Sequence, residues 1–489
     1  MTSHTTASSG DVDLGAGTSG LRANLEIAAV ALGALMASLT QTLVIPVLPV
    51  ISQDIGASTT QAQWLLTATL LVAAVAVPII GRFADMFGRR LMLVVALGGL
   101  TVGSVLDAVT SDATVMIIGR AITGVSSAAI PLGISLLASV LPKERKGSAV
   151  ALISAMLGIG GALGLPLAGA IADSVDYHVL FWIGGVGAAV SIVLILLLVA
   201  EPPTQGVRSV DLPGIVLLAA GLTSLVLPLS QGGTWGWTDA KTLSLLAASV
   251  VLLVFLVLVE KRSAAPLIDL KALSSRPVAL TDLASLFFGF ALFASFVGTA
   301  NYVQAPEATG YGFGSSVLVG GLCLLPSGLF MLLLAPVTAK LNTLWGAGRV
   351  LAIAGFVVAA GLGVRIVLTD SLWQIVLGTA IIGAGTGIGY AALPTLINEF
   401  TPPEDLAAAN GINSLARSMG GTFASAAGGS ILASMTMTLG SYELPSLDGY
   451  RVMFGICAAA ALLSAVFGLV IARSQATGTA QAASHAGAH

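Results

Sequence analysis

The sequence predicts an all-α polytopic membrane protein with two six-helix bundles and two additional helices inserted between them. Three observations lead to this prediction: an apolar composition, fourteen long apolar runs, and motifs that recur in the two halves. The chain has 489 residues, of which 56% are hydrophobic and 9% are charged, and its mean hydropathy is +0.98. Soluble domains carry about 25% charged residues. We therefore expect most of the surface of this chain to face lipid.

The apolar runs predict fourteen membrane-spanning helices. A helix of about 20 residues crosses the ~30 Å hydrocarbon core of a bilayer. Proline, glycine and charged residues mark where each run ends. The predicted helices span residues 26–51, 62–82, 91–109, 113–139, 147–172, 179–200, 212–230, 239–260, 277–301, 315–337, 350–368, 372–396, 407–433 and 451–472.

The basic residues predict the orientation of the chain in the membrane. When the N-terminus is placed in the cytoplasm, most of the 20 Lys and Arg residues fall in segments on the inner side, and only Lys241 falls in an outer loop. Both termini, and the charged stretch GRFADMFGRR at 81–90, are then expected on the cytoplasmic side.

The two halves of the chain share motifs. PIIGRFADMFGRR begins at Pro78, and a weaker copy, PVTAKLNTLWGAGR, begins at Pro336. GRAITG at Gly119 matches GTAIIG at Gly378 at nearly the same separation. This separation exceeds the length of the first six helices, so the helix pair at 211–260 is interpreted as an insertion. Parallel repeats of this kind are typical of secondary transporters, in which two bundles rock about a central site.

The repeat divides the chain into five predicted parts. The polar ends are expected to be disordered, and Cys323 and Cys457 lie inside apolar runs, which predicts no disulfide framework, metal site or cofactor. The parts are a disordered cytoplasmic N-terminus at 1–25, a first bundle at 26–200, the inserted pair with its loops at 201–275, a second bundle at 276–473 and a disordered tail at 474–489.

Several motifs resemble the major facilitator superfamily, specifically its fourteen-spanning drug:proton antiporter branch. GRFADMFGRR resembles the signature between helices 2 and 3, and GRAITG, which contains Arg120, resembles the helix 4 signature. GIGGALGLPLAG at 158–169 resembles the helix 5 antiporter motif. The stretches at 211–222, 230–237 and 260–270 resemble the inserted pair and its exit loop, and AAANGINSLARSMGG at 407–421 resembles a helix of the second half.

The resemblance implies the major facilitator fold and assigns roles to two sets of residues. The first is a gating motif, in which Asp85 would brace against the start of the helix at 407–433 when the cytoplasmic side is closed. The second is a helix 5 motif whose bend limits leak in exporters; ordinary tight packing is the alternative interpretation of its glycines. The gating residues are Gly81, Asp85, Gly88, Arg89 and Arg90, and the helix 5 residues are Gly160, Gly164, Pro166 and Gly169.

Two positions depart from the family pattern. Thr40 stands in the first helix where many members have an aspartate, and Leu165 separates Gly164 from Pro166 where a Gly-Pro pair is usual. The first departure bears on proton coupling, and the second shifts the register of the expected helix 5 bend.

Four charged residues are predicted within or near the hydrocarbon region. Ionisable side chains are costly there and point to function by default. Asp107, Asp282, Arg120 and Arg417 are therefore candidates for proton coupling or for the cavity. The alternative is an interfacial position for the two carboxylates and structural pairing for the two arginines.

The helices that line the central cavity in the superfamily correspond here to the first, fourth, fifth, ninth, twelfth and thirteenth. They contribute mostly apolar and small side chains, with few polar groups and no central carboxylate. We therefore expect neutral or anionic amphipathic substrates rather than dications. The polar candidates for this cavity are Thr40, Gln41, Asn301, Asn410 and Asn413.

Together these features predict a secondary active transporter that exports small hydrophobic or amphipathic compounds by proton antiport and alternating access. The chain has no Walker-type phosphate loop, and GAGTGIG at 383–389 has the small-residue spacing of helix packing, so ATP drive is not expected. No set of nucleophile, base and orienting residue appears, so enzymatic activity is not expected either. The expected partners are the lipid bilayer, a small molecule and protons, with no nucleic acid and a monomeric state. The alternatives are a facilitator or importer of a metabolite, and a membrane sensor that has lost transport.

Overall fold

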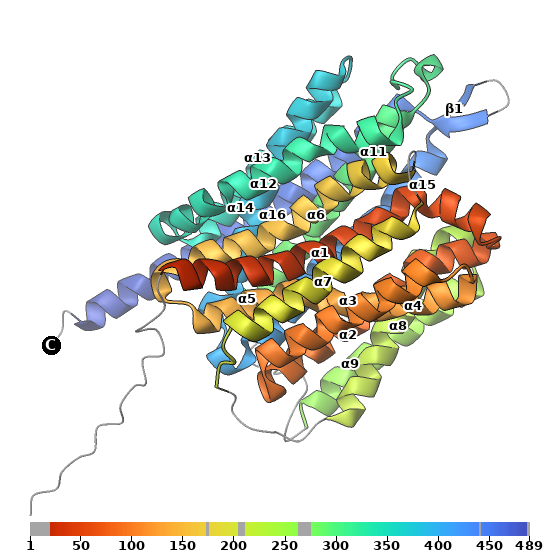
Figure 1. The fold of residues 1–489 in the computed structure, drawn as a ribbon. Coiled ribbons are helices and arrows are strands. Elements are labelled where there is room, and N and C mark those ends of the chain that lie inside the picture. The colour runs from red at the N-terminus through yellow and green to blue at the C-terminus, as the bar shows by residue number, and fades with distance from the viewer. Residues whose placement is uncertain (1–19, 173–175, 204–210, 263–274, 440–441, 487–489) are drawn as a thin grey trace, which may run out of the picture.

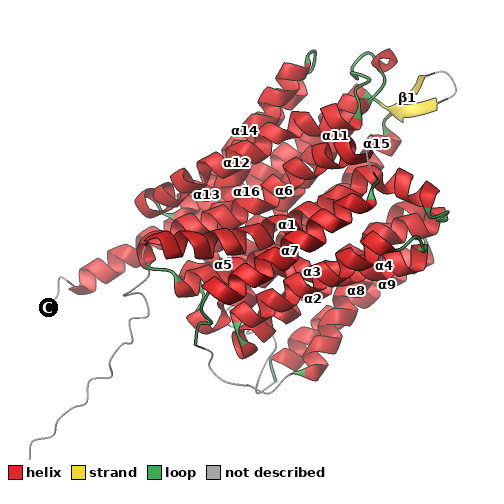
Figure 2. Cartoon of the chain, viewed as in Figure 1, coloured by secondary structure: helices red, strands yellow, loops and turns green. Residues whose placement is uncertain are grey.

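The computed structural model describes residues 20–172, 176–203, 211–262, 275–439 and 442–486. This part of the chain is helical almost throughout (Figure 2), and each of the fourteen predicted helices is present. The helices are α1 (Gly20–Asp54), α2 (Thr59–Phe87), α3 (Arg89–Val109), α4 (Ala113–Gly124), α5 (Ala129–Val140), α6 (Lys143–Ala172), α7 (His178–Leu198), α8 (Leu212–Trp235), α9 (Ala240–Glu260), α11 (Arg276–Gln304), α12 (Val317–Trp345), α13 (Ala347–Val367), α14 (Leu372–Phe400), α15 (Leu406–Ser434) and α16 (Leu447–Ala486).

One predicted helix is divided in the structure. The segment expected as a single helix at 113–139 consists of α4 and α5 joined by a 3-10 turn, η1 (Val125–Ala128). Gly124, the last residue of α4, lies so close to α2 that a Cβ there would come within 2.7 Å of the carbonyl oxygen of Thr69. A 3-10 stretch inside a long helix often marks a hinge or a strained segment.

The ends of the helical region differ from the prediction. Helix α1 begins at Gly20, inside the stretch 1–25 that was expected to be disordered. Helix α16 runs through Ala486, so the disordered tail expected from Ser474 is wrong for the backbone up to that residue. The tail is rich in alanine, the residue with the highest helix propensity, and it continues a helix that is already formed.

Most helices could cross a membrane by length and composition. In the described residues, 12 helical segments meet that criterion, with α4 to α5 taken as one. The two long helices outside this set are α11 and α15, each of 29 residues, which pack against each other. Helix α11 carries Asp282, and α15 carries Asn410, Asn413 and Arg417, which are buried between helices.

The helices form two groups that meet along two seams. The first hydrophobic core lies among α1 to α7 and the second among α11 to α16. In Figure 1 the red-to-yellow helices of the first group lie below the green-to-blue helices of the second. The groups touch where α6 packs on α12 and where α2 packs on α15.

The inserted pair packs on one of these seams. Helix α8 contacts α9, α2 and α15, and a small apolar cluster joins Ala74 of α2, Leu222 of α8 and Leu415 of α15. Two hydrogen bonds hold α8 to α2, because Thr67 bonds to Ser230 at 3.0 Å and accepts from Gln231 at 2.9 Å.

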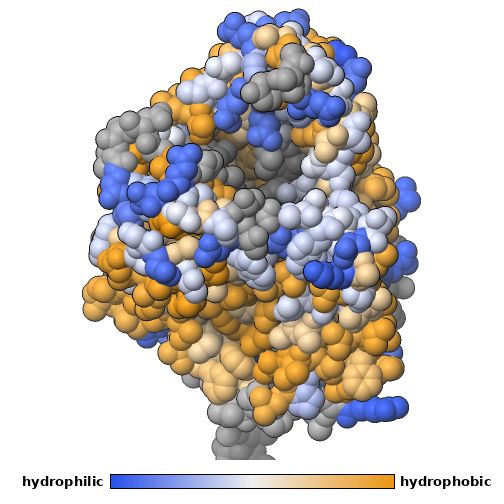
Figure 3. All heavy atoms as spheres, turned by 90° about the vertical axis from the view of Figure 1, so that its right-hand side faces the viewer, coloured by the Kyte–Doolittle hydropathy of each residue, from blue (hydrophilic) through white to orange (hydrophobic). Residues whose placement is uncertain are grey.

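The two ends of the molecule differ. At one end, the antiparallel strands β1 (Thr436–Leu439) and β2 (Tyr442–Pro445) form a hairpin between α15 and α16 (Figure 1). The face at this end is hollowed, with hydrophilic side chains around the hollow and hydrophobic side chains along the flank (Figure 3). The opposite end carries the short connection between α2 and α3, where the predicted gating motif lies.

Candidate functional site

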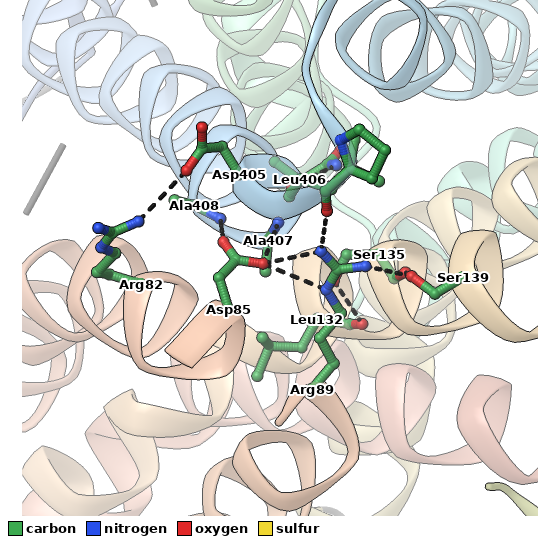
Figure 4. Close-up of polar contacts among 12 residues, drawn as sticks. Arg82, Asp85, Arg89, Leu132, Ser135, Ser139, Asp405, Leu406, Ala407 and Ala408 are labelled. Atoms are coloured by element: carbon green, nitrogen blue, oxygen red, sulfur yellow. Dashed lines mark hydrogen bonds and ion pairs between the residues drawn. The ribbon is translucent and has the colours of Figure 1, made fainter. Parts of the chain in front are cut away.

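Asp85 lies at the N-terminus of α15, a helix more than 300 residues away in the sequence. Its Oδ1 accepts a hydrogen bond from the backbone N–H of Ala407 at 3.2 Å, and its Oδ2 accepts from the N–H of Ala408 at 2.9 Å (Figure 4). The first N–H groups of a helix have no partner within the helix, and the helix dipole favours negative charge there. The carboxylate of Asp85 therefore caps α15 from the other half of the chain.

The residue that normally caps a helix is used differently here. Asp405 occupies the N-cap position of α15, but its side chain makes no capping hydrogen bond. Instead its Oδ1 accepts from Nη1 of Arg82 at 3.3 Å. The two carboxylates thus make reciprocal contacts across the seam: Asp85 of α2 binds the start of α15, and the N-cap residue of α15 binds a base of α2.

Arg89, the first residue of α3, completes the network. Its Nε and Nη2 donate to Asp85 Oδ1 at 3.2 and 2.9 Å, and Nη2 also donates to the carbonyl oxygen of Pro403 at 2.5 Å. Its Nη1 donates to the hydroxyl of Ser139 on α5 (Figure 4). The side chains of Arg89 and Asp85 are only 10% and 2% exposed, so water screens this ion pair little. We call the contacts of Arg82, Asp85 and Arg89 with residues 403–408 the α2–α15 latch.

Two glycines allow the latch to form. A Cβ on Gly81 would lie 2.9 Å from the carbonyl oxygen of Ala407, so only glycine lets α2 approach α15 this closely. Gly88 has φ +119°, a backbone conformation that side chains other than hydrogen rarely adopt. Its counterpart in the second half, Gly346, has φ +80° between α12 and α13, which explains why this glycine persists in both copies of the motif.

Arg90 makes its contacts away from the latch. Its backbone N–H and that of Leu91 donate to the two carboxylate oxygens of Glu201 at 3.0 Å each, and its Nη2 donates to the carbonyl oxygen of Leu196 at 2.5 Å. Glu201 thus caps α3 from the end of α7. Sequence reasoning did not identify Glu201, because nothing in its local pattern indicates which helix it meets.

The second copy of the motif does not form a latch. Thr343 stands at the position that corresponds to Asp85, and its hydroxyl donates to the carbonyl oxygen of Lys340, one turn earlier in the same helix, at 2.8 Å. A hydroxyl engaged within its own helix makes no comparable charged contact with another one. The latch is therefore built from the first copy of the motif.

The glycines of the helix 5 motif lie on two faces of α6. A Cβ on Gly160 would lie 2.8 Å from the backbone nitrogen of Leu39 on α1, and Gly160 accepts a hydrogen bond from Thr42 at 3.0 Å through its carbonyl oxygen. On another face, a Cβ on Gly169 would lie 3.1 Å from the backbone nitrogen of Leu318 on α12. The small residues thus let α6 fit closely between α1 of the first group and α12 of the second.

The remaining members of this motif are accommodated within the same helix. Gly164 faces the hydroxyl of Thr42, and Pro166 lies inside α6, which continues through it to Ala172.

The predicted charged candidates lie in three separate places. Asp107 and Arg120 are buried side by side on α3 and α4. Asp282 on α11 accepts from Asn413 on α15 at 2.9 Å. Arg417, further along α15, lies with its guanidinium 4.7 Å from the centre of the Tyr390 ring.

Of the five polar residues predicted to line the cavity, three are buried and two are at least partly exposed. Thr40, Asn410 and Asn413 are buried, and Asn410 donates to Asn398 at 2.6 Å. Gln41 is partly exposed and donates to Ser127 of η1 at 2.9 Å, and Asn301 is exposed towards the end of α11 that lies near the hairpin. In this conformation three of the five are thus buried, and Gln41, Asn410 and Asn413 bond to side chains of other elements.

One buried charge was missed as a candidate. Arg365 on α13 is 1% exposed and lies with its guanidinium 5.2 Å from the ring centre of Tyr302 and 5.0 Å from that of Phe454. Its separation from Asp107 equals that between the two copies of the gating motif, so the two residues occupy corresponding positions. The repeat contained this signal, but sequence reasoning compared motifs rather than charges.

Comparison with known proteins identifies the family. The sequence profile described as Major Facilitator Superfamily matches residues 30–362 and 286–487. The human organic anion transporter MFSD10 (TETRAN) has the same fold with a TM-score of 0.65 at 15% identity, over 91% of this chain and 99% of that one.

Relatives at the sequence level are transporters or resistance proteins by name. The chain is 28% identical to the tetracenomycin C resistance and export protein of Streptomyces glaucescens, over 83% of this chain and 75% of that protein. It is 26% identical to multidrug resistance protein 3 of Bacillus subtilis (strain 168), over 80% and 76%. An uncharacterized MFS-type transporter of Mycobacterium tuberculosis is 28% identical over 88% of this chain, which spans 64% of that relative. This chain belongs to the major facilitator superfamily.

Proposed function

We propose that this protein is an exporter of small hydrophobic or amphipathic compounds, driven by proton antiport and working by alternating access in the cytoplasmic membrane. The observation that carries the proposal is the asymmetry between the two ends of the molecule. The α2–α15 latch closes the seam at one end, while the face at the other end is hollowed (Figures 3 and 4). A transporter that is open on one side and latched on the other is in one of the two states that alternating access requires.

The direction of transport rests on orientation and on relatives. The basic residues favour the latched end as the cytoplasmic side, with both termini there, so the hollow would open outward. The names of the relatives from Streptomyces glaucescens and Bacillus subtilis connect similar chains with export and drug resistance. The names of these relatives support export as the physiological direction, and the orientation places the open side of this state outside.

Neutral or anionic amphipathic compounds are the proposed substrates. Gln41, partly exposed, offers an amide, and most of its neighbours on α1 are apolar. Asp282 accepts a hydrogen bond from Asn413 between α11 and α15, and we propose that it serves this contact rather than substrate binding. A dicationic substrate would have to be desolvated with little compensation.

The test is efflux from proteoliposomes of defined orientation, with and without a pH gradient. We would use tetracenomycin C and the neutral dye Nile red as probes, and the dication propidium as the comparison. We expect gradient-driven movement of at least one of the first two and none of propidium. Robust propidium transport that persists in Arg120→Ala would refute the substrate class.

A facilitator without proton coupling is the second candidate, and Thr40 favours it. Its hydroxyl donates to the carbonyl oxygen of Met36 within α1 at 2.8 Å, so this position supplies no carboxylate to bind a proton. A pH gradient that drives no uphill movement of any probe, alongside downhill movement of the same probe, would establish this alternative.

A further inference from the structure

Among the described residues, the fully buried carboxylate of Asp107 has no hydrogen-bond partner. Asp107 lies two residues before the end of α3 at Val109, and its residue exposure is 0%. Neither Oδ1 nor Oδ2 accepts a hydrogen bond from any residue that the structure describes. Buried polar groups are nearly always bonded, and an ionised carboxylate in a membrane is especially costly. A buried carboxylate without hydrogen bonds destabilises the fold, so its presence points to a functional role.

A buried base lies across from it on α4. Arg120 is 1% exposed, and its Nε donates to the carbonyl oxygen of Leu65 at 3.5 Å. In the part of the chain that the structure describes, its Nη1 has no hydrogen-bond partner. The preceding residue, Gly119, faces Asp107 so closely that any Cβ there would clash with the Asp107 carboxylate. The two helices are thus fitted to bring the carboxylate beside α4, yet acid and base do not form a direct ion pair.

A carboxylate and a guanidinium that lie close together without a direct ion pair are suited to exchange a proton with the solution. A tight salt bridge would hold the carboxylate permanently ionised, whereas an isolated carboxyl in a low-dielectric site would remain neutral. A carboxylate that is near a guanidinium but not bonded to it lies between these limits, because its charged form is only partly stabilised. A small movement of α3 against α4 would therefore decide whether it holds its proton.

The second half of the molecule has no equivalent acid. Arg365 corresponds to Asp107, and Thr379 corresponds to Arg120. The Thr379 hydroxyl donates to the carbonyl oxygen of Cys323 at 2.7 Å. The pairing of a carboxylate on one helix with a base on the next therefore belongs to the first half.

Helix α4 connects this pair to the partly exposed Gln41 of α1. The carbonyl oxygen of Arg120 accepts from Thr69 at 2.9 Å and from Thr123 at 2.8 Å. One turn further on, α4 passes into the 3-10 turn, where Ser127 accepts from the partly exposed Gln41. A shift of Arg120 along α4 would therefore reach the partly exposed Gln41 through this turn.

We propose that Asp107 is the proton-binding residue of the transport cycle and that Arg120 is its charge partner. This proposal rests on the proposed function, proton antiport. A proton from the outer solution adds to a carboxylate oxygen of Asp107 when the outer side is open, and the same proton leaves to the cytoplasm when the inner side is open. Each turn of the cycle thus moves one proton inward and one molecule of substrate outward. Asp107 returns to its starting protonation state, and no other bond is formed or broken.

Other charged groups near Asp107 lie at the outer rim. On α7, which packs against α3, the ring of His178 lies 3.3 Å from the carbonyl oxygen of Thr110 and is paired with Asp176. Hydrogen bonds from His178 lower the pKa of Asp176 below its usual value. Asp112 caps α4. The other elements packed on α3 are α1, α2, α5 and η1. Helix α1 carries Arg22 and Glu26 near its start and Asp54, which accepts from Tyr177, at its end. The first charged residue of α2 is Arg82, and α5 and η1 contain no charged residue.

The test compares proton drive with substrate exchange in the same proteoliposomes. The variants are Asp107→Asn, Asp107→Glu and the control His178→Gln, assayed with whichever of tetracenomycin C and Nile red the wild type moves faster. We expect Asp107→Asn to lose movement driven by a pH gradient while exchange at equal pH continues. Asp107→Glu should keep the drive with a shifted pH profile, and His178→Gln should match the wild type.

The outcomes separate this proposal from the proposed function. A wild type that shows no gradient-driven movement overturns proton antiport itself. A wild type with such movement and an Asp107→Asn variant that retains it overturns the role of Asp107 alone. Loss of exchange together with drive in both Asp107 variants would also overturn it, because it would show a structural role. A flattened pH profile in His178→Gln would assign the proton to the rim histidine instead.

Discussion

Substitution of Asp85 by asparagine tests the latch directly. The carboxylate caps Ala407 and Ala408 and accepts two N–H groups of Arg89, all in a site where its side chain is 2% exposed. Asparagine has nearly the same shape but only one acceptor oxygen and no charge. Its amide N–H₂ would face either the guanidinium or the helix N–H groups, and in both cases donors would meet donors.

The magnitude follows from the geometry. Removing one partner of a buried ion pair costs about 3–5 kcal/mol, and losing a helix cap costs about 1 kcal/mol. Because asparagine retains one acceptor, we expect a loss near the lower bound, about 3 kcal/mol. These contacts exist only while the α2–α15 seam is closed. The loss should therefore shift the ratio of seam-closed to seam-open molecules by about 100-fold, since 1.4 kcal/mol corresponds to tenfold.

Distance measurement between spin labels can detect this shift. Glu144 at the start of α6 and Pro402 before α15 are exposed and belong to opposite halves, so labelled cysteines there should move apart when the seam opens. The native Cys323 and Cys457 are buried and would be replaced by alanine. We expect wild-type protein in nanodiscs to show mainly the short distance and Asp85→Asn to show a large population at the longer one, with slower transport and normal expression.

A second helix cap provides the matched control. Asp112 caps α4 by accepting from the N–H groups of Thr114 and Val115 at 2.8 and 2.9 Å, but it lies at the other end of the molecule. Asp112→Asn makes the same chemical change and should leave the distances between labels unaltered. If Asp85→Asn also leaves both the distances and the turnover unaltered, the latch does not hold the seam closed.

Two pairs of glycine substitutions test the close contacts, each measured as the melting temperature of purified protein. Gly160→Ala would force a Cβ to within 2.8 Å of the backbone nitrogen of Leu39 and should lower stability by about 1–3 kcal/mol, whereas Gly161→Ala enters open space and should be tolerated. Gly88→Ala places a side chain at φ +119° and should cost about 1–3 kcal/mol, whereas Gly98→Ala, inside α3 with nothing within 4 Å, should not. Equal melting temperatures within either pair would contradict the assigned role of the glycine.

The sequence by itself determined the class of fold and the helices. A membrane requires long apolar helices, so each run of apolar residues identifies a helix without reference to the rest of the chain. The apolar runs therefore located all fourteen helices, with errors at the ends of α1, α2, α12 and α16, of which α12 continues to Trp345, and at the 3-10 turn within 125–128. The motif repeat also related Gly88 to Gly346, two positions that share a positive φ.

Only the tertiary structure decided which polar groups meet. Asp85 and Ala408 are 323 residues apart, and Glu201 meets Arg90 across 111. Such pairs depend on the angles and heights at which whole helices pack, and no local pattern encodes these. The same reason explains why Asp107 and Arg120 could be named separately from the sequence, while their position side by side, without a direct bond, appeared only once α3 and α4 were packed together.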